Sequence, residues 1–225
     1  MKKIIVVGCG GLGIEIVKEH LAKGDQVIGM GVGPVDIKDN NFNYLSLDVS
    51  STEEVERVFS ENASLIDKTD KVYYTVAAMQ TEDNDCIDKF DAEYALNIYN
   101  INTLGALRVV KEIKKYLNDN AQICLVSSKN GSMSETIKFM RYGAEQKFAY
   151  NLSKAALNMG AVILHEKLKE EGIKVIVVHP GSMKTRMSGY QGKNDPAVSA
   201  KGIIEVLENS EENQFYSFAG ERIEW

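Results

Sequence analysis

The stretch from Ile4 to Gly13 reads IIVVGCGGLG and indicates the fold class. Its four β-branched residues predict a strand, and the glycines that follow, Gly8, Gly10 and Gly13, form the pattern G-x-G-x-x-G. A helical pattern of apolar residues begins directly afterwards, at Ile14. In such a unit, small residues and the free N–H groups of the helix let the backbone approach a pyrophosphate. The turn is therefore predicted to bind a nucleotide; the alternative is a tight turn without a ligand.

Short β-branched or aromatic runs recur along the chain and alternate with helical patterns. The predicted strands are Ile4–Val7, Gln26–Met30, Tyr44–Leu47, Val72–Val76, Gln122–Val126, Ile173–Val178 and Gln214–Phe218. The helical segments carry capping signals, such as Ser51 before Glu54 and Asp195 before Pro196. This alternation predicts an α/β fold, a Rossmann-type doubly wound parallel sheet of about seven strands with helices on both faces.

The composition excludes several classes of function. With 26 basic and 32 acidic residues among 225, the net charge of −6 leaves no basic surface to follow the phosphates of a nucleic acid. No run approaches the about 18 apolar residues of a membrane span. Three distant cysteines, Cys9, Cys86 and Cys124, form neither a disulfide framework nor a metal motif. We therefore expect a cytoplasmic protein without a metal, a nucleic-acid partner or a membrane.

A second informative stretch, FAYNLSKAALNM, runs from Phe148 to Met159. Tyr150 and Lys154 are four residues apart, so on a helix their side chains share one face. A phenol has a reference pKa of about 10, and a nearby ammonium group lowers that value. The pair is therefore a candidate general acid. Taken alone, Y-x-x-x-K fits a surface tyrosine and lysine on an amphipathic helix equally well.

Other stretches accompany this pair. They are Asp48 and Val49 after the third predicted strand, Asn102 in INTLG, Ser127 and Ser128 at the end of the fifth, and HPGSMKT from His179 to Thr185. Together with YNLSKAALN they resemble the short-chain dehydrogenase/reductase family over essentially the whole chain. The terminal FAGERIEW, with SSKNGS and SKAALNM, is similar to the branch that includes sniffer-type carbonyl reductases and the C-signal proteins.

The resemblance implies an NAD(P)-dependent oxidoreductase that transfers hydride between nicotinamide and a small carbonyl or alcohol substrate. Tyr150 would then give a proton to the carbonyl oxygen, and Ser128 would hydrogen-bond that oxygen. Lys154 would bind the nicotinamide ribose and lower the pKa of the phenol, and Asn102 would hold a water that links Lys154 to solvent. The implied cofactor-binding residues are Gly8, Gly10, Gly11, Leu12, Gly13, Asp48, Val49, Ala77, Ala78, Tyr150, Lys154, Pro180, Gly181, Met183 and Thr185. Residues 1–225 would form a single dinucleotide-binding and catalytic domain.

Three features depart from the family's pattern. The glycine turn is G-x-G-x-x-G rather than G-x-x-x-G-x-G, and Thr75 to Ala78 stand where the family usually carries NNAG. Apart from these departures, Val27 to Gly33 read VIGMGVG, so the acid expected about 20 residues after the turn to hold a ribose hydroxyl is missing, and no arginine replaces it. The choice between NAD and NADP stays open.

The third departure is the segment between Ser128 and Tyr150, which is longer than usual and carries Lys138, Arg141 and Lys147. Because it joins two candidate catalytic elements, we expect it at the mouth of the site. One hypothesis is that its charges favour an anionic carbonyl substrate. Solvated charges on a surface loop are at least as good an interpretation.

Two other functions and the oligomeric state stay open. The altered turn and the missing NNAG fit a reductase-like signalling or dinucleotide-sensing protein with little turnover. GCGGLG also resembles the ATP-binding turn of ubiquitin-activating-like adenylyltransferases, a function that leaves YNLSK and HPGSMKT unexplained, and the turn alone resembles the first motif of nucleotide-dependent methyltransferases. Relatives often form homo-oligomers through the helices expected at Leu104–Leu117 and from Tyr150 onward, and the long segment beside the second helix could block such pairing, so a homo-oligomer stays possible.

Overall fold

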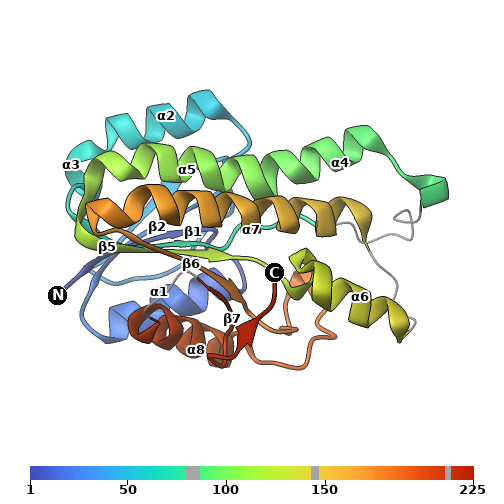
Figure 1. Cartoon of the computed structure of the whole chain (residues 1–225). Helices are drawn as coiled ribbons and strands as arrows, with labels where there is room; N and C mark the ends of the chain where they lie inside the picture. The colour runs from blue at the N-terminus through green and yellow to red at the C-terminus, as the bar shows by residue number, and fades with distance from the viewer. Residues whose placement is uncertain (80–86, 143–146, 211–213) are drawn as a thin grey trace.

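A computed structural model of the chain describes residues 1–79, 87–142, 147–210 and 214–225. Figure 1 shows one central sheet between two helical layers. The strands are β1 (Lys3–Val7), β2 (Gln26–Gly31), β3 (Phe42–Ser46), β4 (Thr69–Tyr74), β5 (Leu117–Val126), β6 (Lys174–His179), β7 (Phe215–Ser217) and β8 (Arg222–Ile223). Their spatial order is β3-β2-β1-β4-β5-β6-β7-β8. The predicted Rossmann-type α/β class is confirmed.

The expected number of about seven strands was wrong, because the described residues form eight. β8 folds back from β7 through a turn in which Gly220 has a φ of +85°, and it pairs antiparallel with β7. All other neighbouring strands pair parallel. A two-residue strand is too short to show an alternating pattern, so the sequence carries no signal for it.

Helices cover both faces of the sheet. One layer holds α2 (Thr52–Glu61), α4 (Ala92–Tyr99), α5 (Gly105–Ile113) and α7 (Phe148–Leu168), and the other holds α1 (Leu12–Ala22) and α8 (Pro196–Asn209) (Figure 1). The remaining helical segments are α3 (Ala63–Ile66), α6 (Met133–Arg141), η1 (Ile87–Lys89), η2 (Asn100–Leu104), η3 (Lys114–Tyr116), η4 (Lys129–Gly131), η5 (Lys169–Glu171) and η6 (Arg186–Ser188).

Each face of the sheet carries its own apolar cluster. Ile5 and Val7 of β1 pack in the cluster that also contains residues of α2, α5 and α7. Ile4 and Val6 pack in the cluster with residues of α1 and α8. Because both faces of the strand are buried, β1 is apolar at every position from 4 to 7 instead of alternating.

The capping signals fix two helix starts, and one of them positions a site residue. The carboxylate of Asp195 accepts the Ala197 N–H at 2.8 Å, and the hydroxyl of Ser51 accepts the Glu54 N–H at 3.2 Å. The Glu54 carboxylate turns to the Asp48 N–H instead, at 3.0 Å. This bond anchors the loop after β3, where Asp48 lies, on the first turn of α2.

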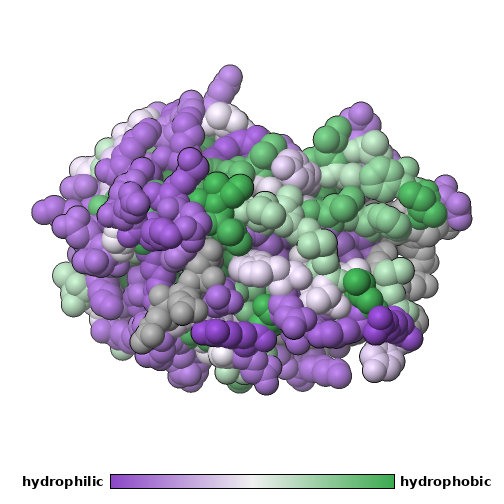
Figure 2. Space-filling view, in the orientation of Figure 1, coloured by the Kyte–Doolittle hydropathy of each residue, from purple (hydrophilic) through white to green (hydrophobic). Residues whose placement is uncertain are grey.

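Apolar side chains also gather on part of the surface. Figure 2 shows them over α4 and the first half of α7, where Leu96, Leu152 and Met159 are each more than half exposed. An oligomer formed through α5 and α7 stays a prediction. No helix in the described part of the chain is both long and apolar enough to cross a membrane.

Candidate active site

Tyr150 and Lys154 lie on the buried face of α7. The Lys154 ammonium nitrogen is 5.8 Å from the centroid of the Tyr150 ring and donates a hydrogen bond to the Val126 carbonyl, at the end of β5, at 3.0 Å. Only 1% of Lys154 is exposed, and this burial lowers its pKa to about 7. Burial raises the pKa of Tyr150, and a hydrogen bond with Ser128 opposes that rise. The expectation that Lys154 lowers this pKa was wrong, because burial outweighs the groups around the phenol. The three candidate catalytic side chains therefore meet in one buried place.

The loop after β5 is fixed against α7. The Ser127 hydroxyl donates to the Asn158 side chain at 2.6 Å, and the Asn158 amide donates to the Gly131 carbonyl at 3.1 Å. A Cβ on Gly131 would lie 2.7 Å from the carbonyl carbon of Lys154, so a larger residue would push the two backbones apart. This close approach holds Ser128 over the helix that carries Tyr150.

Asn102 connects the end of β4 to α7. It lies in the π-helical turn η2, between α4 and α5. Its side-chain oxygen accepts the Ala78 N–H at 2.7 Å, and its amide donates to the Ala78 carbonyl at 2.9 Å and to the Ser153 hydroxyl at 2.9 Å. Ser153 in turn donates to the Tyr150 carbonyl at 2.7 Å. The side chain thus braces α7, and the water-holding role stays a prediction.

The turn after β1 leaves space for a ligand. Gly8 has a φ of +102°, and a Cβ on Gly13 would lie 1.9 Å from the Gly8 carbonyl oxygen. Gly10 has no neighbouring atom within 4 Å of such a Cβ. The residue that caps α1, Gly11, has no side chain to accept a hydrogen bond from the first turn, so Leu12 and Gly13 begin the helix without a side-chain cap. An anion fits such a helix start.

The loop after β6 reaches this turn. A Cβ on Gly11 would lie 3.1 Å from the Thr185 methyl group, which places the predicted Pro180–Thr185 segment beside the glycine turn. Gly181 has a φ of +80°, and Met183 forms a bridge with Asn194. Met183 also packs against the α1 and α8 cluster, so its side chain contributes to the core.

Asp48 and Val49 have structural partners of their own. The Asp48 carboxylate accepts hydrogen bonds from the Ser50 N–H at 2.9 Å and the Ser50 hydroxyl at 2.7 Å. Val49 is buried, and a Cβ on Gly105 of α5 would lie 2.9 Å from its side chain. Both residues lie at the carboxyl end of β3, where ligands of parallel sheets collect.

The ends of β1 and β4 are held together without NNAG by bonds that were not predicted from the sequence. Ala77 and Ala78 follow β4, and the Thr75 hydroxyl ahead of them donates to the Gly8 carbonyl at 2.6 Å. Asn102 supplies the second tie, to Ala78. A threonine in place of the first asparagine of the motif was the available signal, because its hydroxyl can make the same kind of cross-strand bond.

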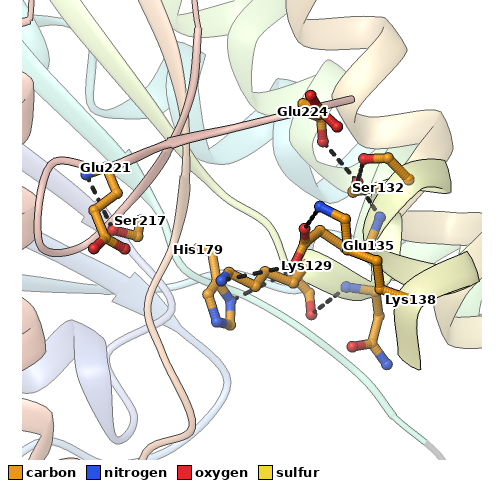
Figure 3. Close-up of polar contacts among 11 residues, drawn as sticks. Lys129, Ser132, Glu135, Lys138, His179, Ser217, Glu221 and Glu224 are labelled. Atoms are coloured by element: carbon orange, nitrogen blue, oxygen red, sulfur yellow. Dashed lines mark hydrogen bonds and ion pairs between the residues drawn. The ribbon is translucent and has the colours of Figure 1, made fainter. Parts of the chain in front are cut away.

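A charged cluster surrounds Lys129, the residue that follows Ser128 in the sequence (Figure 3). The Glu135 carboxylate lies 2.7 Å from the Lys138 ammonium nitrogen and 3.7 Å from that of Lys129. The Lys129 N–H donates to Nδ1 of His179 at 3.4 Å, and burial lowers the pKa of His179 to about 4. The imidazole is therefore neutral. Lys138, a residue of the anionic-substrate hypothesis, already has a carboxylate partner.

Comparison with known proteins identifies the family. The model of the short chain dehydrogenase family matches residues 2–196. The chain belongs to the short-chain dehydrogenase family. This assignment confirms the expected enzyme class, an oxidoreductase, and leaves the adenylyltransferase and methyltransferase interpretations of GCGGLG without support.

Two curated relatives illustrate the assignment. The chain is 28% identical to the 1-hydroxy-2-glutathionyl-2-methyl-3-butene dehydrogenase of Rhodococcus sp. over 72% of this chain and 70% of the relative. It is 30% identical to the C-signal protein of Myxococcus xanthus over 60% of this chain and 82% of the relative.

Solved structures share the fold. The NADPH-bound carbonyl reductase from chicken fatty liver superimposes with a TM-score of 0.88 at 20% identity and covers 100% of this chain and 94% of its own. The carbonyl reductase Sniffer of Drosophila melanogaster gives a TM-score of 0.86 at 19% identity and covers 100% of both chains. At these identities the likenesses show the shared fold, and the narrower branch indicated by the terminal motifs stays a prediction.

Proposed function

We propose that this protein is an NAD(P)-dependent oxidoreductase that transfers hydride between nicotinamide and a small carbonyl or alcohol substrate, with Tyr150 as the general acid and base. The observation that carries the proposal is the meeting of Tyr150, Lys154 and Ser128 in one buried place. When bound, the dinucleotide supplies the hydride, and the protein supplies proton, orientation and charge.

The residues at the carboxyl end of the sheet fit a dinucleotide. The uncapped start of α1 and the open space at Gly10 suit its pyrophosphate. Thr185 lies against the same turn and would close over it, while Asp48 and Val49 would flank the adenine side. The similar fold from chicken fatty liver is described with NADPH bound, which supports the same class of cofactor here.

The proton step follows from the environment of Tyr150. Its raised pKa keeps the phenol protonated at neutral pH, so it can donate to a substrate oxygen that gains negative charge. The hydrogen bond with Ser128 stabilises the phenolate left behind, and the Lys154 ammonium nitrogen lies 5.8 Å from the centroid of the ring. Because the pKa of Lys154 is about 7, this side chain can itself take up and release a proton near neutral pH.

A turnover assay tests the proposal. The purified protein is incubated with NADH or NADPH and a panel of small ketones and aldehydes, and the loss of the reduced nicotinamide is followed. We expect turnover by the unmodified protein and a loss of about 10²-fold or more for Ser128→Ala and for Lys154→Met. Binding of the dinucleotide without turnover of any carbonyl would favour the sensing role instead.

A further inference from the structure

The end of β2 lies beside the glycine turn and carries no charged side chain. A Cβ on Gly31 would lie 3.6 Å from the Cys9 backbone nitrogen and 4.0 Å from the Gly8 Cα. In dinucleotide-binding folds with this turn, an acid here holds the adenosine ribose 2′-hydroxyl of NAD, and an arginine nearby accommodates the 2′-phosphate of NADP. Gly31, Val32 and Gly33 provide neither group.

The side chain of Tyr44, on β3, occupies that place. Its hydroxyl oxygen lies 3.3 Å from the Cβ that a residue at position 31 would carry, and it donates a hydrogen bond to the Gly33 carbonyl at 2.5 Å. Phe42, two residues earlier on the same face of β3, lies 3.0 Å from the corresponding Cβ position at Gly29. The aromatic side chains of β3 thus approach the space that side chains at positions 29 and 31 would occupy, and the Tyr44 hydroxyl lies where the missing acid would stand.

The surroundings of this hydroxyl are neutral. Burial raises the pKa of Tyr44, so the phenol stays protonated at physiological pH. Burial also raises the pKa of the Cys9 thiol, to about 12. Neither the phenol nor the thiol beside it therefore carries a charge at physiological pH. The adjoining Val32 is 79% exposed, which leaves the subsite open to water.

We propose that the Tyr44 hydroxyl is the adenosine-ribose contact of this protein and accepts a hydrogen bond from the ribose 2′-hydroxyl. The inference rests on the proposed function, because it places a dinucleotide in the glycine turn. Tyr44 already donates its own hydrogen to Gly33, so its oxygen is free to accept. An uncharged, open subsite neither repels nor attracts a 2′-phosphate. NADH and NADPH should therefore bind within about tenfold of each other.

A double-mutant cycle on protein and ligand tests the contact. The dissociation constants of NADH and of its 2′-deoxyadenosine analogue are measured by fluorescence titration for the unmodified protein and for Tyr44→Phe. We expect the unmodified protein to bind the 2′-deoxy analogue about 2- to 10-fold more weakly than NADH. Tyr44→Phe should weaken NADH by the same factor and leave the 2′-deoxy analogue unchanged.

Two results would overturn the contact. Equal losses for both ligands would mean that Tyr44 acts through the Gly33 turn rather than on the 2′-hydroxyl, and no loss for either would mean that it makes no contact. Tyr142→Phe is the matched control, because Tyr142 is 90% exposed at the end of α6 and is not one of the proposed dinucleotide-binding residues. It should leave both dissociation constants unchanged.

A charge substitution tests the position of the ribose. The double variant Gly31→Asp, Tyr44→Phe restores a carboxylate and removes the hydroxyl that would crowd it. NADPH should then bind at least about tenfold more weakly relative to NADH, because the carboxylate repels the 2′-phosphate. An unchanged ratio, or a preference above about tenfold in the unmodified protein, would contradict the neutral ribose subsite. If the unmodified protein binds neither dinucleotide, the proposed function itself fails.

Discussion

Lys154 is a candidate catalytic residue that is only 1% exposed, and its burial makes the free energy of unfolding depend on pH. Its pKa falls from 10.5 to about 7 because burial disfavours the charged form. Between those values the unfolded chain holds a proton that the folded protein does not. The free energy of unfolding therefore gains a term that rises with pH from about 7 to about 10.5, by at most about 1.4 kcal/mol per pH unit.

The first prediction at this scale is that Lys154→Met removes that term. Urea unfolding at pH 7, 8, 9 and 10 should show the difference between the variant and the unmodified protein shrinking as pH rises, since the cost of burying the ammonium group disappears. A difference that stays constant across this range would contradict the lowered pKa.

The second prediction concerns the close approach between η4 and α7. Gly131→Ala places a Cβ 2.7 Å from the Lys154 backbone, so it should lower the free energy of unfolding by about 1–3 kcal/mol and reduce turnover. Gly160→Ala, within α7, meets only the end of Leu107 at 3.4 Å and should be neutral or stabilising by up to about 1 kcal/mol. Similar losses for both variants would show that the approach at Gly131 has no special role.

At the scale of elements, α6 brings charge to the mouth of the site. Glu135 pairs with both Lys129 and Lys138, and the Ser132 hydroxyl that caps the helix also donates to the Glu224 carbonyl at 2.6 Å (Figure 3). The Lys138 ammonium group holds the pKa of Glu135 below its usual range, so the carboxylate stays ionised and balances one of the two lysines. The helix is thus tied to the loop after β5 and to the C-terminal tail.

The third prediction is that Glu135→Gln changes selectivity. Without the carboxylate, two ammonium groups are left uncompensated, and kcat/KM for a carboxylated ketone should rise by about 2- to 5-fold relative to a neutral ketone. Glu166→Gln is the control, since it breaks a comparable Lys–Glu pair on the exposed side of α7. Unchanged selectivity for Glu135→Gln would remove the support for an anionic substrate.

Elements were predictable where a side chain defines their start. Ser51 and Asp195 begin α2 and α8, as their capping patterns indicate. The start of α6 had the same signal, Ser132 three residues before Glu135, but it lies in a segment interpreted as a loop. The strand β5 begins at Leu117, before the expected Gln122, because its first residues are polar and partly exposed. The π turn that holds Asn102 depends on contacts with Ala78 and Ser153, which the sequence does not show.

At the scale of the whole molecule, the parallel pairing places the carboxyl ends of β1, β3, β4, β5 and β6 on the same side of the sheet, and the loops that follow these strands carry most of the predicted site residues. This convergence was predictable from the strand–helix alternation, because parallel strands place their carboxyl ends together. The exact partners, such as Thr75 with Gly8, follow from register and needed the structure. All eight strands belong to one sheet, which supports the single-domain interpretation.

The fourth prediction is that the fold is sensitive to acid through two buried neutral histidines. Burial lowers the pKa of His20 and lowers that of His179 to about 4. Below about pH 6.5 the histidines of the unfolded chain therefore bind protons that the same side chains in the folded protein do not bind. Stability should fall as pH drops from 6.5 to 4. In His179→Gln, measured by urea unfolding, the fall should be smaller, and an identical fall would contradict the neutral imidazole.

The central claim is that Tyr150 delivers the proton while the glycine turn holds the dinucleotide. Its most direct test is a single-turnover measurement, in which protein with prebound reduced cofactor is mixed with a ketone substrate and the oxidation of the cofactor is followed. Tyr150→Phe should keep the dissociation constant of the cofactor within a few-fold and lose at least about 10²-fold in the rate of hydride transfer. A hydride-transfer rate equal to that of the unmodified protein would contradict the account.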